Sequence, residues 1–356
     1  MRWGGGNGRA AVLARRGALL VTASEEDGAV QFWDPARLRG CETISSLPRD
    51  LTDVALSPDG RAASVHWGGE VCLLDPASHG FERSLDLLTP HGKAGPTAVA
   101  FSPDGRTLAA GCADHQTRLW DVTSGRQILT LDHGARVTAV AFSPAGGLMA
   151  TAGDKGEVRL WELPSGARHA TCTTRATLCN CLAFAADGRT LAVGRYDDVF
   201  AVNLWDPSSA ELQGRLMDPA SALAAAPRTE ATLCVAAVAF SPDGVTLAAG
   251  CSDGIIRLWD IASGDLRLTL SGHVGLVNRL DFTPDGRTLA SLGEDRVLSL
   301  WHLATGQRLF SLDARGQELH GLAFSRDGRL LVAGARPFGD ASPSSLLMWR
   351  AGPAGP

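Results

Sequence analysis

The 356-residue chain carries 33 Lys and Arg residues against 38 Asp and Glu residues, a formal net charge of -5, and no basic cluster offsets this balance. The charge pattern therefore excludes the electrostatic footprint of a nucleic-acid-binding protein. Hydrophobic residues make up 45% of the chain and charged residues 20%, as in an ordinary globular protein. No apolar run approaches the roughly 20 residues that cross a bilayer, so we expect no membrane partner.

The N-terminal residues 1–24 contain an apolar stretch that superficially resembles a signal peptide. Arg15 and Arg16 interrupt that stretch, and residues 11–24 align with residues 99–112 further along the chain. We therefore interpret the segment as β-strands and expect a cytoplasmic protein.

One sequence unit recurs along the whole chain, with an FSPDG-type segment at its start and Leu-Trp-Asp at its end. Four clear copies occupy residues 99–121, 140–162, 238–260 and 280–302, a worn copy occupies 11–34, and weaker copies end at 74–75, 205–206 and 349–350. Self-similarity at a period of about 40 to 45 residues indicates a stacked or radial array of repeats.

Each unit predicts four short antiparallel strands. In the copy at 97–131 the expected strands are 97–101, 108–111, 117–120 and 127–131. Pro and Gly in the intervening segment 102–105 are typical of a tight turn, because Pro fixes φ and Gly tolerates positive φ. A four-stranded sheet with two apolar faces is not stable alone, whereas radial stacking buries both faces. The sequence therefore predicts an all-β fold, a β-propeller of four-stranded blades.

These repeats resemble the WD-repeat family of β-propellers, in the form found in bacteria, over residues 10–350. The family implies a hydrogen-bonded set inside each blade, with a His just ahead of the first strand. The copy at 280–302, taken with the residues just before it, holds all its members: His273, Ser291, Asp295 and Trp301. For the copy at 140–162, the preceding His133 and the internal Thr151 and Trp161 are present, but Lys155 stands at the position of the Asp. The resemblance implies that these residues are structural and not catalytic.

Counting the worn first copy gives eight blades, which we favour, and seven blades plus an N-terminal remnant is the alternative. The last copy has no fourth strand of its own after Trp349. In the family, residues ahead of the first repeat supply that strand, and residues 1–9 form a poor strand because they are rich in Gly. We expect residues 1–9 to be a tail or partial closing strand, 10–350 the propeller and 351–356 a tail. Either the ring closes weakly or the chain is part of a longer protein.

We find no catalytic motif among the residues, beyond those that their positions in the repeat explain. G-x-S-x-G, H-E-x-x-H and G-x-x-x-x-G-K-[ST] sequences are lacking. Cys112 and Cys251 hold one phase of different repeats, so they cannot form a disulfide. Cys179 and Cys181 share one strand face, but no His or Cys pair matches them at zinc spacing. We expect no enzyme activity, no cofactor, no metal, and reduced, packed thiols.

Departures from the repeat point to one face of the ring. Insertions fall near residues 216–233 and 336–345, in connections that the family places on the top face. Just before the turn between the second and third strands, Trp67 and Tyr196 replace small residues, and Arg residues lie close by in two copies. Large aromatic residues and Arg are enriched in protein interfaces. The candidate interaction residues are Trp67, Arg195, Tyr196, Glu294, Arg336 and Phe338. The alternative is that Trp67 and Tyr196 fill the central channel or pack on neighbouring loops.

The sequence thus favours a non-catalytic scaffold that binds a protein or peptide through its top face. A second interpretation is a sensory or regulatory module of a larger bacterial signalling protein, for example one associated with a kinase. A third is a propeller enzyme or small-ligand binder, which requires convergent polar groups in the central channel.

Overall fold

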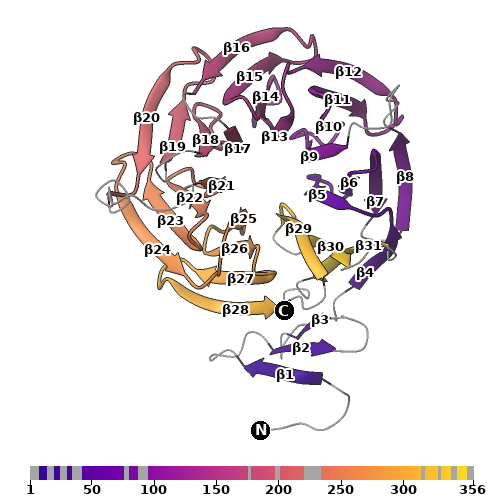
Figure 1. The fold of residues 1–356 in the computed structure, drawn as a ribbon, viewed down its shortest axis with the longest axis vertical. Helices are drawn as coiled ribbons and strands as arrows, with labels where there is room; N and C mark the ends of the chain where they lie inside the picture. The colour runs from indigo at the N-terminus through magenta and orange to yellow at the C-terminus, as the bar shows by residue number, and fades with distance from the viewer. Residues whose placement is uncertain are drawn as a thin grey trace.

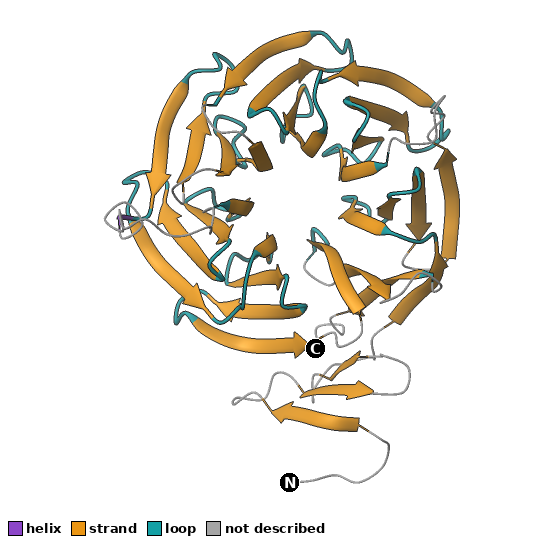
Figure 2. Ribbon diagram, in the orientation of Figure 1, coloured by secondary structure: helices purple, strands orange, loops and turns teal. Residues whose placement is uncertain are grey.

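A computed structural model describes residues 8–13, 20–24, 30–33, 42–75, 80–86, 95–174, 178–196, 201–219, 234–313, 317–327, 330–337 and 343–350. Figure 2 shows that strands joined by turns make up nearly all of this described part. Among its residues, no helix has the length and apolar character needed to span a membrane.

Seven four-stranded antiparallel sheets stand radially around a common axis and form a β-propeller (Figure 1). In each sheet, or blade, the first strand lies nearest the axis and the fourth forms the outer rim. The favoured count of eight blades is therefore wrong, and the alternative of seven is correct. The reason is that the strands of the worn first copy do not enter the ring as a blade; they form a separate three-stranded sheet.

The first four blades each take their strands from one continuous segment of the chain, in order from the axis to the rim. Blade 1 comprises β5 (Leu51–Leu56), β6 (Ala62–His66), β7 (Glu70–Asp75) and β8 (Gly80–Asp86). Blade 2 comprises β9 (Pro96–Phe101), β10 (Thr107–Cys112), β11 (Gln116–Asp121) and β12 (Gln127–Asp132). Blade 3 comprises β13 (Val137–Phe142), β14 (Leu148–Gly153), β15 (Glu157–Glu162) and β16 (Arg168–Thr173). Blade 4 comprises β17 (Leu178–Phe184), β18 (Leu191–Tyr196), β19 (Ala201–Trp205) and β20 (Leu212–Met217).

The remaining blades follow the same order until the last, which borrows its fourth strand from the N-terminal part of the chain. Blade 5 comprises β21 (Val235–Phe240), β22 (Thr246–Cys251), β23 (Ile255–Asp260) and β24 (Leu266–Ser271). Blade 6 comprises β25 (Val277–Phe282), β26 (Thr288–Gly293), β27 (Val297–His302) and β28 (Gln307–Asp313). Blade 7 comprises β29 (Gln317–Phe324), β30 (Leu330–Pro337), β31 (Ser344–Arg350) and β4 (Glu42–Leu47). The separate sheet comprises β1 (Gly8–Leu13), β2 (Leu20–Ser24) and β3 (Val30–Trp33).

The turn between the first and second strands is held by its own side chains. In blade 2, the Ser102 hydroxyl donates to Asp104 Oδ1 at 2.6 Å and accepts from the Thr107 amide at 2.9 Å. Gly105 has a φ of 71°, in the left-handed region that residues with a Cβ enter only at a cost. Because every bond is local, the Ser-Pro-Asp-Gly sequence folds in the same way in blades 1, 2 and 5, where it recurs.

The apolar core lies between neighbouring blades. Leu73 of blade 1 is buried in one cluster with Leu108 and Trp120 of blade 2. The second and third strands are almost fully buried, since their two faces contact different blades. Each blade therefore depends on its neighbours, and the stability of the ring depends on how its two ends are joined.

Strand β4 joins those ends. It pairs antiparallel with β31 and forms the outer strand of blade 7. Ile44 and Leu47 are only 4% and 3% exposed, and they share a buried cluster with Met348 of blade 7 and Leu51 of blade 1. The closing strand, sought among residues 1–9 in the sequence, thus follows the worn first copy instead of preceding it.

A second contact crosses blade 7 on the inner side of the ring. Arg279 Nη2 of blade 6 lies 3.1 Å from Asp53 Oδ1 of blade 1, and Asp53 Oδ2 accepts from the Val99 amide of blade 2 at 3.1 Å. On blade 7, a Cβ added to Gly321 would lie 3.2 Å from Asp53 Oδ1 and 2.5 Å from the Val54 nitrogen. The absence of a side chain at Gly321 leaves room for the ion pair, which links blades 6 and 1 past the blade between them.

Candidate functional site

The top of the ring is the face that carries the turns between second and third strands and the connections between blades. In blade 6 it is supported by four bonded side chains. His273 Nδ1 lies 3.0 Å from both carboxylate oxygens of Asp295, and His273 Nε2 lies 2.7 Å from Ser291 Oγ. Trp301 Nε1 donates to the same Ser291 Oγ at 2.8 Å. The structure thus brings together all four residues of the expected set, and their mutual bonds support a structural role.

Blade 3 contains part of the same arrangement. His133 Nδ1 lies 2.8 Å from Thr151 Oγ1, and Trp161 Nε1 donates to that hydroxyl at 2.9 Å. Lys155, at the position of the Asp, is exposed and donates from Nζ to the Gly134 carbonyl at 3.2 Å. Burial lowers the pKa of His133 to about 4, so this imidazole is neutral in the folded protein at pH 7.

Blades 2 and 5 each contain a buried arginine–carboxylate pair, which we did not expect from the sequence, whereas blades 3 and 6 have the histidine-centred bonds. Arg118 lies 2.6 Å from Asp114, and Arg257 lies 2.8 Å from both Asp253 and Asp218. Both guanidinium groups are almost fully buried, so the carboxylates compensate their charge. The signal in the sequence is an Arg two residues before the repeat's Trp together with an Asp four residues before that Arg; the copy in blade 3 has the Arg but not the Asp.

Trp67 lies at the top of blade 1, in the turn between β6 and β7, and is 46% exposed. Arg136, in the connection from blade 2 to blade 3, places its guanidinium carbon 5.4 Å from the centroid of the Trp67 ring. This is a cation–π contact. A Cβ added to Gly95 would lie 2.8 Å from Trp67 Cδ2, so one part of the indole packs on that backbone. Trp67 therefore contacts neighbouring connections and also presents a large aromatic surface to solvent.

The other candidate interaction residues differ in their surroundings. Arg336 forms an ion pair with Glu318 and lies 3.7 Å from Asp50, so its charge is compensated within the ring. Glu294 is exposed on the top of blade 6. Arg195 is only 7% exposed, so it does not contribute to an exposed patch as we expected.

Of the two remaining candidates, the structure describes the backbone of Tyr196 and does not describe Phe338. Tyr196 ends β18, where its backbone pairs with Leu178 of β17. Phe338 lies outside the described residues, as do residues 220–233 and 338–342 of the two insertions.

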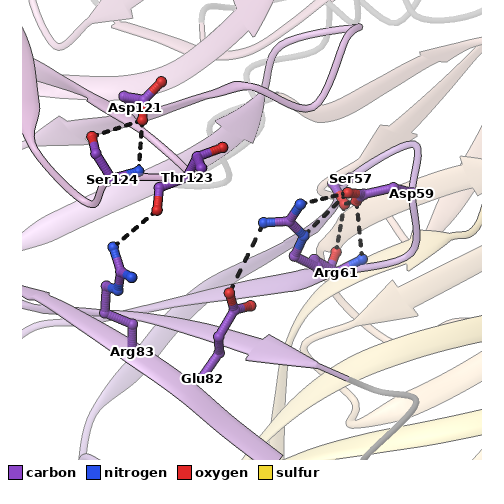
Figure 3. A network of polar contacts seen from close by, with 8 residues as sticks. All are labelled: Ser57, Asp59, Arg61, Glu82, Arg83, Asp121, Thr123 and Ser124. Atoms are coloured by element: carbon purple, nitrogen blue, oxygen red, sulfur yellow. Dashed lines mark hydrogen bonds and ion pairs between the residues drawn. The ribbon is translucent and has the colours of Figure 1, made fainter.

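Polar groups at the opposite, bottom face bond to one another within the ring. Arg61 Nη2 lies 2.9 Å from Asp59 and Arg61 Nη1 lies 4.0 Å from Glu82, while Arg83 donates to the Thr123 carbonyl of blade 2 at 3.3 Å. Figure 3 draws this network with Ser57, Asp59, Arg61, Glu82, Arg83, Asp121, Thr123 and Ser124. The bottom turns therefore use these charges to hold each turn and to link the rims of neighbouring blades.

The described residues give no sign of a metal centre, since they contain no group of three or more His, Cys, Asp or Glu side chains that could hold an ion. Burial raises the pKa of the Cys72 thiol to about 11 and of the Cys112 thiol to about 12. Such thiols remain protonated at pH 7 and are poor nucleophiles. The cysteines in the described part of the chain act as small core residues.

The repeats match two described families. Residues 139–338, more than half of the chain, match the β-propeller described as "Nucleolar protein 10-like, N-terminal domain". Residues 82–121 match "WD domain, G-beta repeat". The chain belongs to the WD-repeat β-propellers.

Individual proteins are similar in sequence to parts of this WD-repeat propeller. It is 28% identical over 165 residues to small ribosomal subunit protein RACK1y of Oryza sativa, covering 46% of this chain and 34% of the relative. It is 33% identical over 110 residues to a guanine nucleotide-binding protein subunit beta of Arabidopsis thaliana, covering 30% of this chain and 29% of the relative. A 41-residue segment is 56% identical to the probable serine/threonine-protein kinase PkwA of Thermomonospora curvata, covering 12% of this chain and 6% of the relative. The matched segments thus span about a third or less of these relatives.

Proposed function

We propose that this WD-repeat propeller is a non-catalytic scaffold that binds a protein partner through the top of its ring. The observation that carries the proposal is Trp67, a large aromatic side chain left 46% exposed in a turn whose backbone is held by hydrogen bonds from the Trp67 amide to the Asp50 carbonyl and from the Gly69 amide to the His66 carbonyl. Rigid, exposed aromatic residues are the typical anchors of protein interfaces, because they bury a large area at a small entropic cost. The names of two relatives, which describe subunits of larger assemblies, support the same function.

The bottom face is the weaker candidate. Its carboxylates are engaged in their own turns, as Asp104 illustrates: the hydrogen bond from the Ser102 hydroxyl lowers the pKa of that carboxyl. A partner would have to displace these local bonds before it could use the same groups. The exposed face of Trp67 requires no such displacement.

The test compares two exposed aromatic residues on different faces. Trp67→Ala removes the aromatic side chain from the top, and Phe81→Ala removes one that is 56% exposed on the outer rim. Each tagged variant and the unaltered protein are purified from the native host, and bound proteins are quantified by mass spectrometry. We expect a partner that is lost with Trp67→Ala and retained with Phe81→Ala, with little change in thermal stability for either. A partner retained by Trp67→Ala contradicts the proposal.

A second candidate function is a regulatory module of a bacterial kinase-type signalling protein. It is supported by the 41-residue match to PkwA, a segment about as long as one repeat. The same purification separates the candidates, since a regulatory module would recover kinase sequence on the same polypeptide or as its main partner. Recovery of neither argues against this second function.

A further inference from the structure

Arg136 differs from three other arginines on the top face. Arg118, Arg257 and Arg336 each have a carboxylate partner. Arg136 is exposed, and among the described residues its guanidinium has no ion pair and no side-chain hydrogen bond, only the contact with the Trp67 ring. A guanidinium stacked on an aromatic ring keeps its N–H donors for an anion. Arg136 thus offers a pre-positioned cation beside an exposed apolar surface.

The surroundings of this pair carry charges of both signs. Lys155 Nζ lies 3.2 Å from the Gly134 carbonyl, so a second cation reaches the connection that carries Arg136. Asp154 opposes it: its amide donates to the Arg136 carbonyl at 3.1 Å, and its carboxylate is exposed on the same turn. Asp132 also opposes it, since its exposed carboxylate accepts from the Gly134 amide at 2.8 Å in the same connection. The part of this site that can bind an anionic group is therefore the Arg136 guanidinium itself, which has no ion pair among the described residues.

A strained residue stands at the edge of the same region. His115 has a φ of 73°, at a turn position where blades 3 and 5 have Gly156 and Gly254 with φ of 71° and 78°. The carbonyl of His115 accepts from the amide of His133, at the start of the connection that carries Arg136. Blade 6 has Arg296 at the same position with a φ of 65°, so the strain is a recurring feature of this turn. What distinguishes His115 is that its exposed side chain lies next to the connection that carries Arg136.

We propose that Trp67, Arg136 and His115, which we call the Trp–Arg clamp, bind an acidic segment of the partner polypeptide. An Asp or Glu carboxylate accepts hydrogen bonds from the Arg136 guanidinium, and an apolar side chain next to it packs on Trp67. His115 lines the edge of the segment, where its imidazole donates to or accepts from the partner's backbone. The inference rests on the proposed scaffold function and names the class of partner that the top face recognises.

The test uses short fluorescent peptides in which Glu residues flank a Leu or Phe, with matched peptides that carry Gln or Lys in place of Glu. Binding to the full chain is measured by fluorescence anisotropy at low and high salt. We expect the Glu peptides to bind better than the Gln and Lys peptides, with an affinity that falls as salt screens the charges. Saturable binding to none of the Glu peptides, or a preference for the Lys peptides, overturns the inference.

Variants locate the binding. Arg136→Gln is expected to weaken the Glu peptides by about tenfold or more, the loss of a charge-assisted hydrogen bond. Arg136→Glu is expected to transfer the preference to the Lys peptides. Arg296→Gln, a change at another exposed arginine on the top of blade 6, is the matched control and should leave binding unchanged. Equal effects of Arg136→Gln and Arg296→Gln would overturn the clamp.

The two proposals fail separately. If the host partner depends on Trp67 but binds Arg136→Gln and Arg136→Glu as well as the unaltered protein, the scaffold function stands and the acidic class of partner is wrong. If the partner is indifferent to Trp67→Ala as well, both proposals fall. Urea unfolding curves of each variant show that these exposed substitutions leave the ring folded.

Discussion

Closure of the ring by β4 gives a sharp prediction about which N-terminal residues the propeller needs. Ile44 is 4% exposed and packs in the core between blades 7 and 1. Replacing a buried Ile by Ala removes its transfer free energy and leaves a cavity, at a cost of about 2 to 5 kcal/mol. Because whole domains are stable by only about 5 to 15 kcal/mol, Ile44→Ala should lower the free energy of unfolding by a large fraction. The measurement is urea unfolding followed by tryptophan fluorescence and circular dichroism.

Deletion of residues 1–33 is the matched control. It removes β1, β2 and β3, which form a sheet of their own, and keeps β4 in the ring. We expect the free energy of unfolding to change by no more than about 0.5 kcal/mol, as for changes away from the core. In an eight-bladed ring the same deletion would remove most of a blade. Collapse of the 34–356 fragment, together with a harmless Ile44→Ala, would therefore refute the closure by β4.

Two further predictions concern charges inside the ring. In a double-mutant cycle with Asp53→Asn and Arg279→Gln, the free energies of unfolding should show a coupling of about 1 kcal/mol, since the ion pair across blade 7 is only partly exposed. A coupling of zero would mean that the pair does not help to close the ring. Burial lowers the pKa of His133 to about 4, below its unfolded value near 6.5, so its contribution to stability is lost as the pH falls from about 6.5 to 4, by up to about 2 kcal/mol at pH 5. Burial raises the pKa of Asp281 from 3.8 to about 7, so its contribution to stability is lost as the pH rises from about 3.8 to 7. Urea unfolding at pH 7 and pH 5 should therefore show that acidification lowers the free energy of unfolding less in His133→Gln, and more in Asp281→Asn, than in the unaltered protein. The opposite order would contradict these assignments.

The parts of the fold that depend on neighbours along the chain could be predicted from the sequence. The strand expected at 108–111 lies within β10 (Thr107–Cys112), and the turn at 102–105 closes through Ser102 and Asp104 as its residue types indicate. The blade count could not be predicted in this way. Ile44 follows Trp33 by eleven residues, the spacing at which Leu131 follows Trp120, so β4 has the pattern of a fourth strand for its own copy. Its choice of β31 over β3 depends on packing around the whole ring.

The residues of the candidate site also differ in whether local sequence patterns could predict them. Trp67 could be singled out because it replaces a small residue at a fixed position of the repeat. Its contact with Arg136 could not be found, since that contact joins turns from different blades that no local pattern relates. Arg195 was misjudged because a position near the top turn does not fix exposure, and its side chain is buried.

The central claim is that the partner binds the top of the ring, and hydrogen–deuterium exchange of the full chain with and without the captured partner tests it most directly. The account predicts slower exchange in the top segments 66–69, 113–116 and 133–136 when the partner is bound. It also predicts unchanged exchange in the bottom turns 57–61 and 102–106. Protection confined to those bottom turns, with the top segments unchanged, would contradict the account.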